Sequence, residues 1–264
     1  MHDKTMPART YYIPASVRMN DLVEHRERSD RFQLLNGEWK FQYYNSIYDV
    51  TESFYEKGYD VSGFDQVTVP GVWQMDGYDT HQYTNIRYPF PFDPPYVPQD
   101  IPCGAYVHNF EYHREKKASK AFLNFEGVDS CFYVWVNGAY AGYSQVPHAT
   151  SEFDVTDLLN EGENTLAVLV LKWCDGSYLE DQDKFRMSGI FRDVYLLKRP
   201  ETTIRDYYIT TDVEKDSVVV KLDMHFAEPV ETKVTIEDKY GAVVARGETA
   251  ENGCLLYTSD AADE

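Results

Sequence analysis

The sequence feature that most restricts the fold is the run TLAVLVLKW at residues 165–173. Its side chains are apolar at almost every position, whereas a strand with one wet face alternates apolar and polar residues. No stretch of the chain approaches the roughly 20 apolar residues that span a membrane. We therefore expect residues 165–173 to form a strand buried on both faces, in the middle of a β-sandwich.

Other short strand-like segments lie on both sides of this run and are separated by turn signals. CFYVWVN ends in Asn137 and GAYAGYSQ begins with Gly138, and an Asn-Gly pair between two strand-like segments is typical of a type I′ hairpin. Regular short strands with little helix between them predict an all-β fold, with an antiparallel β-sandwich over residues 31–199. Residues 1–30 are polar and irregular, so we expect an N-terminal arm that lies on another part of the protein.

A second β domain is expected after Pro200. The alternating segments TTIRDYYITTDV, SVVVKLDMHF, ETKVTIEDKY and AVVARGE favour an immunoglobulin-like sandwich over residues 200–253. That fold needs about seven strands in about 100 residues, so we expect only its beginning here. Residues 254–264, CLLYTSDAADE, show no strand alternation and resemble translated sequencing-adapter DNA. We therefore expect residues 254–264 to be a non-native tail and the natural part of the chain to be a truncated fragment.

The charge balance excludes one class of partner. The chain has 25 basic and 44 acidic residues, a formal net charge of −19, and such a field repels nucleic acid. The polar start of the chain is unlike a signal peptide, which predicts a cytoplasmic protein without a membrane partner. The four cysteines lack metal-ligand spacing, so we expect reduced thiols at Cys103, Cys131, Cys174 and Cys254.

The stretch from Trp173 to Asp193, WCDGSYLEDQDKFRMSGIFRD, combines acids with aromatics. Carboxylates accept hydrogen bonds from hydroxyl groups and rings cover the apolar faces of a sugar, so the mixture suits a polyhydroxylated ligand. The alternative is an acidic, solvated loop. We expect Arg186 and Arg192 to offset part of the acid charge. The acids other than Asp183 are predicted to shape the loop by bonding backbone amides: Asp175, Glu180 and Asp181.

Residues 88–102, YPFPFDPPYVPQDIP, contain six prolines. Proline lacks the amide donor and fixes φ, so this segment predicts a stiff, extended loop rather than a strand. Such a loop suits a rigid wall beside a site or a subunit contact, and a plain linker is the alternative.

Four strings in the same order carry a resemblance to a known family: LNGEW at 35–39, VPGVWQMDGYDTHQYTN at 69–85, YPFPFDPPYVP at 88–98 and DGSYLEDQDKFRMSGIFRDV at 175–194. Over roughly residues 31–253 the chain resembles the amino-terminal part of bacterial β-galactosidases of glycoside hydrolase family 2. The resemblance implies a jelly-roll sugar-binding domain, then an immunoglobulin-like domain. Both catalytic glutamates are expected on a (β/α)₈ barrel outside this sequence.

The resemblance also implies roles for particular residues. It places Asn85, the asparagine of YTN, on the galactosyl unit, and Asp183, the last residue of EDQD, on galactose and on a sodium ion. Trp73 and His81 are expected either beside the site or in plain packing. No catalytic residue is expected in this chain.

The implied parent enzyme removes terminal non-reducing β-D-galactose, as from lactose, by a retaining two-glutamate mechanism. It is expected to use Mg²⁺ bound outside this sequence and to form a homo-oligomer, a tetramer in relatives. The fragment alone is predicted to be inactive. Two alternatives remain, a stand-alone carbohydrate-binding module and an oligomerisation segment without activity. A self-contained catalyst using Asp181 and Asp183 is disfavoured, because carboxylates on one loop do not easily flank a glycosidic bond from two sides.

Overall fold

The computed structural model describes residues 4–180, 182–213, 215, 217–249 and 254–260. It divides the chain into two compact units, one of Met1–Ala8 with Ile13–Arg199 and one of Arg9–Tyr12 with Pro200–Glu264. In the described ranges the helices are three short 3-10 turns, η1 (Arg26–Arg28), η2 (Ile47–Asp49) and η3 (Asp175–Leu179). The predicted all-β class is confirmed. None of the described helices is long and apolar enough to cross a membrane.

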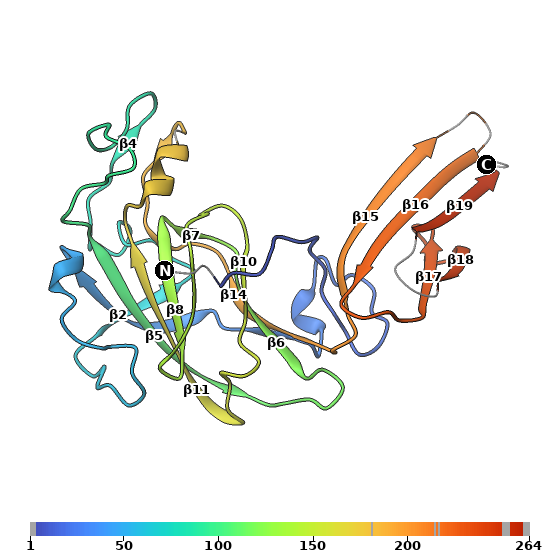
Figure 1. Ribbon diagram of the computed structural model, residues 1–264, viewed down its shortest axis with the longest axis horizontal. Coiled ribbons are helices and arrows are strands. Elements are labelled where there is room, and N and C mark those ends of the chain that lie inside the picture. The colour runs from blue at the N-terminus through green and yellow to red at the C-terminus, as the bar shows by residue number, and fades with distance from the viewer. Residues whose placement is uncertain (1–3, 181, 214, 216, 250–253, 261–264) are drawn as a thin grey trace. The chain divides into compact units, whose positions relative to one another are not determined.

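Two antiparallel sheets build the larger unit (Figure 1). The order of the six-stranded sheet is β3-β2-β5-β11-β8-β9, and that of the four-stranded sheet is β1-β14-β6-β10. The six strands are β3 (Asp65–Val69), β2 (Gly37–Tyr44), β5 (Cys103–Tyr112), β11 (Gly162–Leu171), β8 (Cys131–Val136) and β9 (Ala139–Ser144). The four are β1 (Phe32–Leu34), β14 (Val194–Arg199), β6 (Lys120–Phe125) and β10 (Ser151–Asp154).

Strand β11 contains most of the apolar run and lies inside the six-stranded sheet, as predicted. It pairs with β5 from Gly162 opposite Tyr112 to Leu171 opposite Cys103, and with β8 on its other edge. Strand β8 turns into β9 through Asn137 and Gly138, whose φ angles are 53° and 84°. Positive φ at both central residues is the requirement of a type I′ turn, which confirms the hairpin prediction.

The larger sheet is apolar on both faces because each face is covered. The inner face packs against the smaller sheet in the main core, with Leu166, Val168 and Val170 of β11 fully buried. On the outer face, Ala167 and Leu169 pack under residues 44–64, which contribute Phe54 and several half-buried aromatic rings. This second covering explains why β11 does not alternate.

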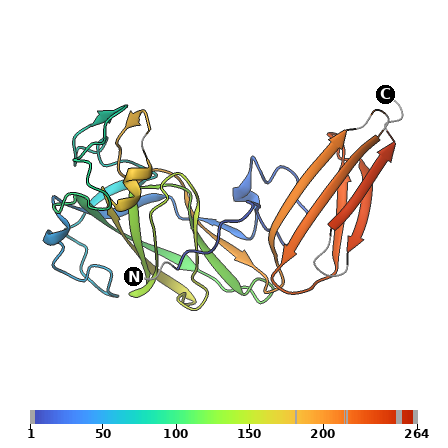
Figure 2. The ribbon, with the colours of Figure 1, turned by 45° about the horizontal axis from the view of Figure 1, so that its top comes forward.

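The smaller unit contains two sheets (Figures 1 and 2). Strand β16 (Ser217–Phe226) lies between β15 (Ile204–Val213) and β19 (Cys254–Asp260), and β17 (Thr232–Glu237) pairs with β18 (Val243–Thr249). Thr10 of the N-terminal segment belongs to this unit and bonds the Asp206 carboxylate. Strand β19 pairs with β16 although its sequence shows no strand alternation, since backbone pairing does not need side-chain alternation.

Candidate functional site

Two short ladders hold the loop that follows β11. Strand β4 (Tyr83–Thr84) pairs with β12 (Lys184–Phe185), and β7 (Val128–Asp129) pairs with β13 (Gly189–Ile190). The first ladder joins the YTN segment to the loop, and the second joins the loop to the strand region before β8. The two ladders therefore hold the C-terminal end of this loop, residues 184–190, before the chain enters β14.

The ladder between β4 and β12 ends next to the two residues predicted to bind the sugar. Lys184 lies opposite Thr84 in an antiparallel register, Asn85 directly follows Thr84, and Asp183 directly precedes Lys184. Both residues are solvent-exposed. An exposed amide and an exposed carboxylate can bond hydroxyls of a ligand.

Tyr83 orients Asp183 and is a site residue that the sequence analysis did not single out. Its hydroxyl donates to Asp183 Oδ1, which raises the pKa of Tyr83, and its ring packs 5.5 Å from that of Phe185. The Asn85 Oδ1 atom accepts the backbone N–H of Ile86 at 2.7 Å. The only available signal for Tyr83 was its place two residues before Asn85 in the YTN string.

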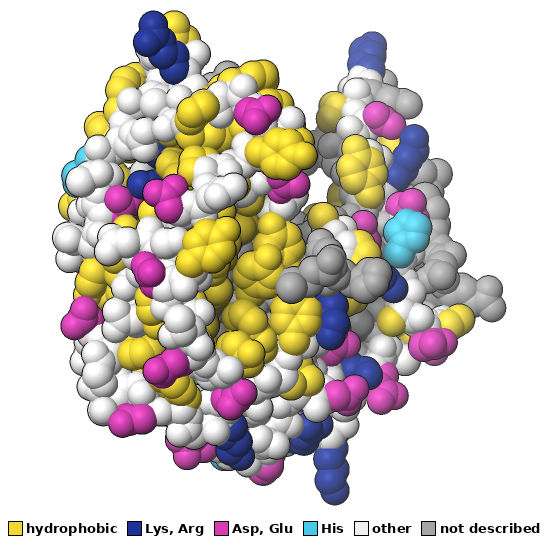
Figure 3. All heavy atoms as spheres, turned by 60° about the vertical axis from the view of Figure 1, so that its left-hand side comes forward, with side chains coloured by type: hydrophobic (Ala, Val, Ile, Leu, Met, Phe, Trp, Pro, Cys, Tyr) yellow, Lys and Arg dark blue, Asp and Glu magenta, His cyan; other side chains and the backbone are white. Residues whose placement is uncertain are grey.

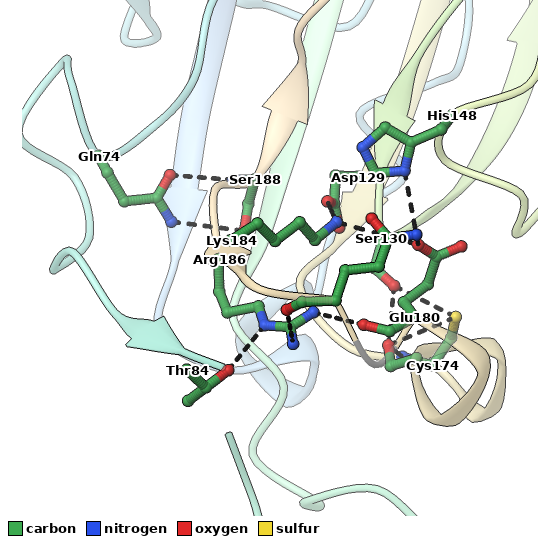
Figure 4. Close-up of polar contacts among 12 residues, drawn as sticks. Gln74, Thr84, Asp129, Ser130, His148, Cys174, Glu180, Lys184, Arg186 and Ser188 are labelled. Carbon is green, nitrogen blue, oxygen red and sulfur yellow. Dashed lines mark hydrogen bonds and ion pairs between the residues drawn. The ribbon is translucent and has the colours of Figure 1, made fainter. Parts of the chain in front are cut away.

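Arg186 is the buried centre of the loop (Figure 4). Its Nε donates to Thr84 Oγ1 at 2.9 Å, and its terminal nitrogens donate to the carbonyls of Glu180 at 2.6 Å and Gln182 at 2.9 Å. Its backbone N–H donates to the carbonyl of Gln82 at 2.7 Å. Arg186 thus fastens both the acidic loop and the YTN segment through neutral oxygens.

Arg186 and Arg192 were expected to offset part of the acid charge, and among the described residues the Arg186 side chain donates to carbonyls and a hydroxyl rather than to carboxylates. Arg192 donates to the carbonyl of His148 at 3.4 Å and lies over the Phe191 ring. A lysine instead pairs with one acid of the loop, Glu180, and with Asp129 of β7. Lys184 Nζ lies 3.3 Å from Asp129 and 3.9 Å from Glu180, which also faces His148 at 3.5 Å.

This charged group sits beside the site and is partly shielded from water (Figure 4). Burial raises the pKa of Asp129, and the Lys184 ammonium opposes the rise. Because Lys184 directly follows Asp183, these ion pairs also fix the backbone at Asp183. Neither Asp129 nor His148 was selected from the sequence, since both come from segments distant in the chain.

The acids other than Asp183 have different roles from one another. Asp175 accepts the backbone N–H of Gly176 at 2.9 Å, which confirms its loop-shaping role. Glu180 forms ion pairs through its side chain, so the prediction that it bonds a backbone amide is wrong. Asp181 lies outside the described residues. At Glu180, ion pairs with Lys184 and His148 stand where a bond to a backbone amide was expected.

The proline-rich segment forms no strand, as predicted, and is tied to the site loop through Tyr178. The Tyr178 hydroxyl donates to the carbonyl of Tyr96 at 2.6 Å and accepts the backbone N–H of Asp93 at 3.1 Å. Its ring packs against those of Tyr88, Phe90 and Phe92 at 5.3–5.5 Å. The proline-rich segment therefore packs along one side of the site loop, at Tyr178.

A buried ion pair supports the approach to β4. Lys172, at the end of β11, places its Nζ 2.5 Å from Asp79, which also accepts a hydrogen bond from Gln74. Trp73 is 2% exposed and donates from Nε1 to Tyr106, so packing is its role, whereas His81 is exposed. These contacts hold the segment between β3 and β4 against the large sheet.

Beneath the loop lie two thiols in contact. Hydrogen bonds from Cys131, and further ones from Ser130 and Ser177, lower the pKa of Cys174 to about 6 although burial opposes this. Cys103, Cys131 and Cys174 are free and buried, as predicted; the side chain of Cys254 lies outside the described residues. Ser130 Oγ lies 3.3 Å from Cys174 Sγ (Figure 4).

Comparison with known proteins gives the family of this arrangement. Residues 32–200 match the family described as glycosyl hydrolases family 2, sugar binding domain. A β-galactosidase of Actinobacillus pleuropneumoniae is 50% identical over 216 residues, which are 82% of this chain and 21% of the relative. A β-galactosidase of Staphylococcus xylosus is 46% identical over 84% of this chain and 22% of its own length. The chain thus spans about a fifth of these relatives.

A solved structure agrees in fold. A β-glucuronidase of an uncultured Clostridium sp. superposes with a TM-score of 0.67 and 25% sequence identity, covering 88% of this chain and 40% of the other. The likeness therefore extends over most of this chain and leaves more than half of that enzyme unmatched.

Proposed function

The chain belongs to glycosyl hydrolase family 2, and from that membership we propose that it forms the sugar-binding wall of a β-galactosidase. The observation that supports the proposal is the β4–β12 ladder, in which Thr84 and Lys184, the chain neighbours of the exposed residues Asn85 and Asp183, pair with each other. The Asn85 amide and the Asp183 carboxylate would bond hydroxyls of the terminal galactose unit. Tyr83 and Arg186 would hold these two groups in place.

The bond-cleaving step is proposed to lie elsewhere in a longer protein. Retaining hydrolysis of a terminal β-D-galactoside such as lactose needs two carboxyl groups about 5 to 5.5 Å apart on opposite sides of the bond. We propose two glutamates of a barrel domain for these roles. This chain alone would position the sugar and would not hydrolyse it.

The chemistry of Asp183 also supports a cation beside the sugar. A hard carboxylate oxygen suits sodium, and we propose Asp183 as one ligand. Among the described residues no three His, Cys, Asp or Glu side chains gather into a metal-binding group, so the remaining ligands would be water, carbonyls or residues of the longer protein. We also propose that the longer protein binds Mg²⁺ outside this sequence, forms a homo-oligomer and is cytoplasmic.

The test is Asp183→Asn in the longer enzyme, assayed with a chromogenic galactoside at varied sodium concentration. A hydrogen bond to a charged group is worth roughly 1.5 to 3 kcal/mol, so KM should rise about ten- to a hundredfold and the sodium dependence should disappear. Asp157→Asn is the matched control, because Asp157 is an exposed carboxylate on the turn after β10. Unchanged activation of Asp183→Asn by sodium would refute the role of Asp183.

A stand-alone carbohydrate-binding module is the second candidate, and the description of the matched family as a sugar binding domain favours it. This candidate requires galactose affinity in the 264-residue chain itself. Calorimetry with the isolated chain tests it, and absence of heat at millimolar galactose removes it.

A further inference from the structure

A second hollow lies on the outer face of the larger sheet, away from the site loop. Its volume is about 360 Å³, within the range of small-molecule pockets. Its lining includes Phe54, Tyr59, Val107, Asn109, Glu163 and Thr165. None of them belongs to the candidate site already described.

The pocket and the candidate site lie at opposite ends of β11. Thr165 pairs with Asn109 at the pocket, whereas Leu171, where the site loop begins, pairs with Cys103. Six residues of strand separate Thr165 from Leu171, which corresponds to about 20 Å at the rise of an antiparallel strand. One monosaccharide cannot occupy both places.

One side of the pocket is apolar and rigid. Phe54 and Val107 are 2% and 5% exposed, and the Phe54 ring packs edge-on against Trp135 at 6.0 Å. The hydroxyl of Tyr59 donates to Glu52, which fixes its ring orientation. In the face of the larger unit turned to the viewer in Figure 3, hydrophobic side chains gather in the middle and acidic side chains lie around them.

The other side offers hydrogen-bonding groups that the protein does not use. Thr165 Oγ1 donates to Asn109 Oδ1 at 2.9 Å, which leaves the Asn109 amide nitrogen as a donor. Within the described ranges, no hydrogen bond or ion pair engages the side chains of Glu56, Lys57 or Glu163, which also line the pocket. Donors and acceptors therefore face an apolar wall.

We propose that this pocket is a second saccharide site, which binds a neutral pyranose by stacking on the half-buried Tyr59 ring and by hydrogen-bonding to Asn109 and Glu163. Apolar ring faces and a rim of hydroxyls are the features of a ligand that match such a lining. Two carboxylates against one ammonium at the rim disfavour anionic ligands such as phosphate. The site needs no group of the candidate site.

The test is a ¹⁵N NMR titration of the 264-residue chain with methyl β-galactoside, lactose and glucose, with inorganic phosphate as the negative probe. We expect saturable shifts at residues 107–109 and 163–165 with at least one saccharide at millimolar concentration. Asn109→Ala combined with Glu163→Gln should raise Kd about tenfold, as expected for a lost hydrogen bond to a charged group. Asp183→Asn should leave these shifts unchanged.

Four outcomes would overturn the proposal. The first is absence of shifts at the pocket up to about 100 mM saccharide, because an affinity weaker than that is too weak to matter for binding. The others are equal shifts with phosphate, an unchanged Kd in the double variant, and loss of the shifts in Asp183→Asn. Both substituted residues are exposed, and retained dispersion of the amide spectrum shows that the variant is folded. Loss of the shifts in Asp183→Asn alone would assign the binding to the first site. Failure of the proposed β-galactosidase role would be seen separately, in the sodium assay of Asp183→Asn.

Discussion

Arg186 donates from Nε to Thr84 Oγ1 across 2.9 Å and so joins two segments that come from different halves of the larger unit. The same guanidinium bonds two carbonyls of the acidic loop. One planar side chain therefore sets the distance between the strand that leads to Asn85 and the loop that carries Asp183.

Arg186→Lys should destabilise the larger unit, because an ammonium cannot reproduce the planar fork that reaches three oxygens. We expect the free energy of unfolding to fall by about 2 to 4 kcal/mol. All four tryptophans lie in the larger unit, so fluorescence during urea denaturation reports this transition. Arg192→Lys is the control, since one 3.4 Å bond is at stake, and a change of equal size in both variants would refute the special role of Arg186.

The ion pair between Lys172 and Asp79 should show strong coupling. Lys172→Met leaves a largely buried carboxylate without its cation and should cost about 3 to 5 kcal/mol of unfolding free energy. Adding Asp79→Asn removes that charge and should restore much of the loss while Gln74 keeps an acceptor. A double-mutant cycle by urea denaturation measures this, and strictly additive effects would contradict it.

The thiols should differ in reactivity with pH. Hydrogen bonds from Cys131 and its neighbours lower the pKa of Cys174 to about 6, whereas burial raises the pKa of Cys103 to about 12. The thiolate is the nucleophile, so iodoacetamide labelling of Cys174 should rise with pH through about 6 and level off near neutrality. Peptide mapping after labelling at pH 5 to 9 follows each residue. A midpoint near 9 at Cys174, or faster labelling of Cys103, would count against this assignment.

The sequence contained enough to predict the β-class and the place of β11. Periodicity revealed the strands because burial acts on every residue of a strand in the same way. Asn85 and Asp183 came from a resemblance carried by contiguous strings, and the structure adds a ladder between their chain neighbours, Thr84 and Lys184. Their roles stay predictions.

What the sequence did not indicate depends on contacts between distant segments. Arg186 looked like a counter-charge to its acidic neighbours, yet its partners are carbonyls whose positions only the closed loop defines. Tyr83, Asp129 and His148 gain their roles from pairing across the fold. The outer-face pocket likewise combines residues 54–61 with β5 and β11, and no single stretch of sequence shows that combination.

The two-residue ladder between β4 and β12 has a consequence for the order of events during synthesis. Asn85 leaves the ribosome long before Asp183, and until Lys184 and Phe185 emerge Thr84 and Tyr83 have no strand to pair with. Formation of the proposed sugar site would thus be a late event in the nascent chain. Sugar present during translation would stabilise only molecules in which the sandwich has already closed.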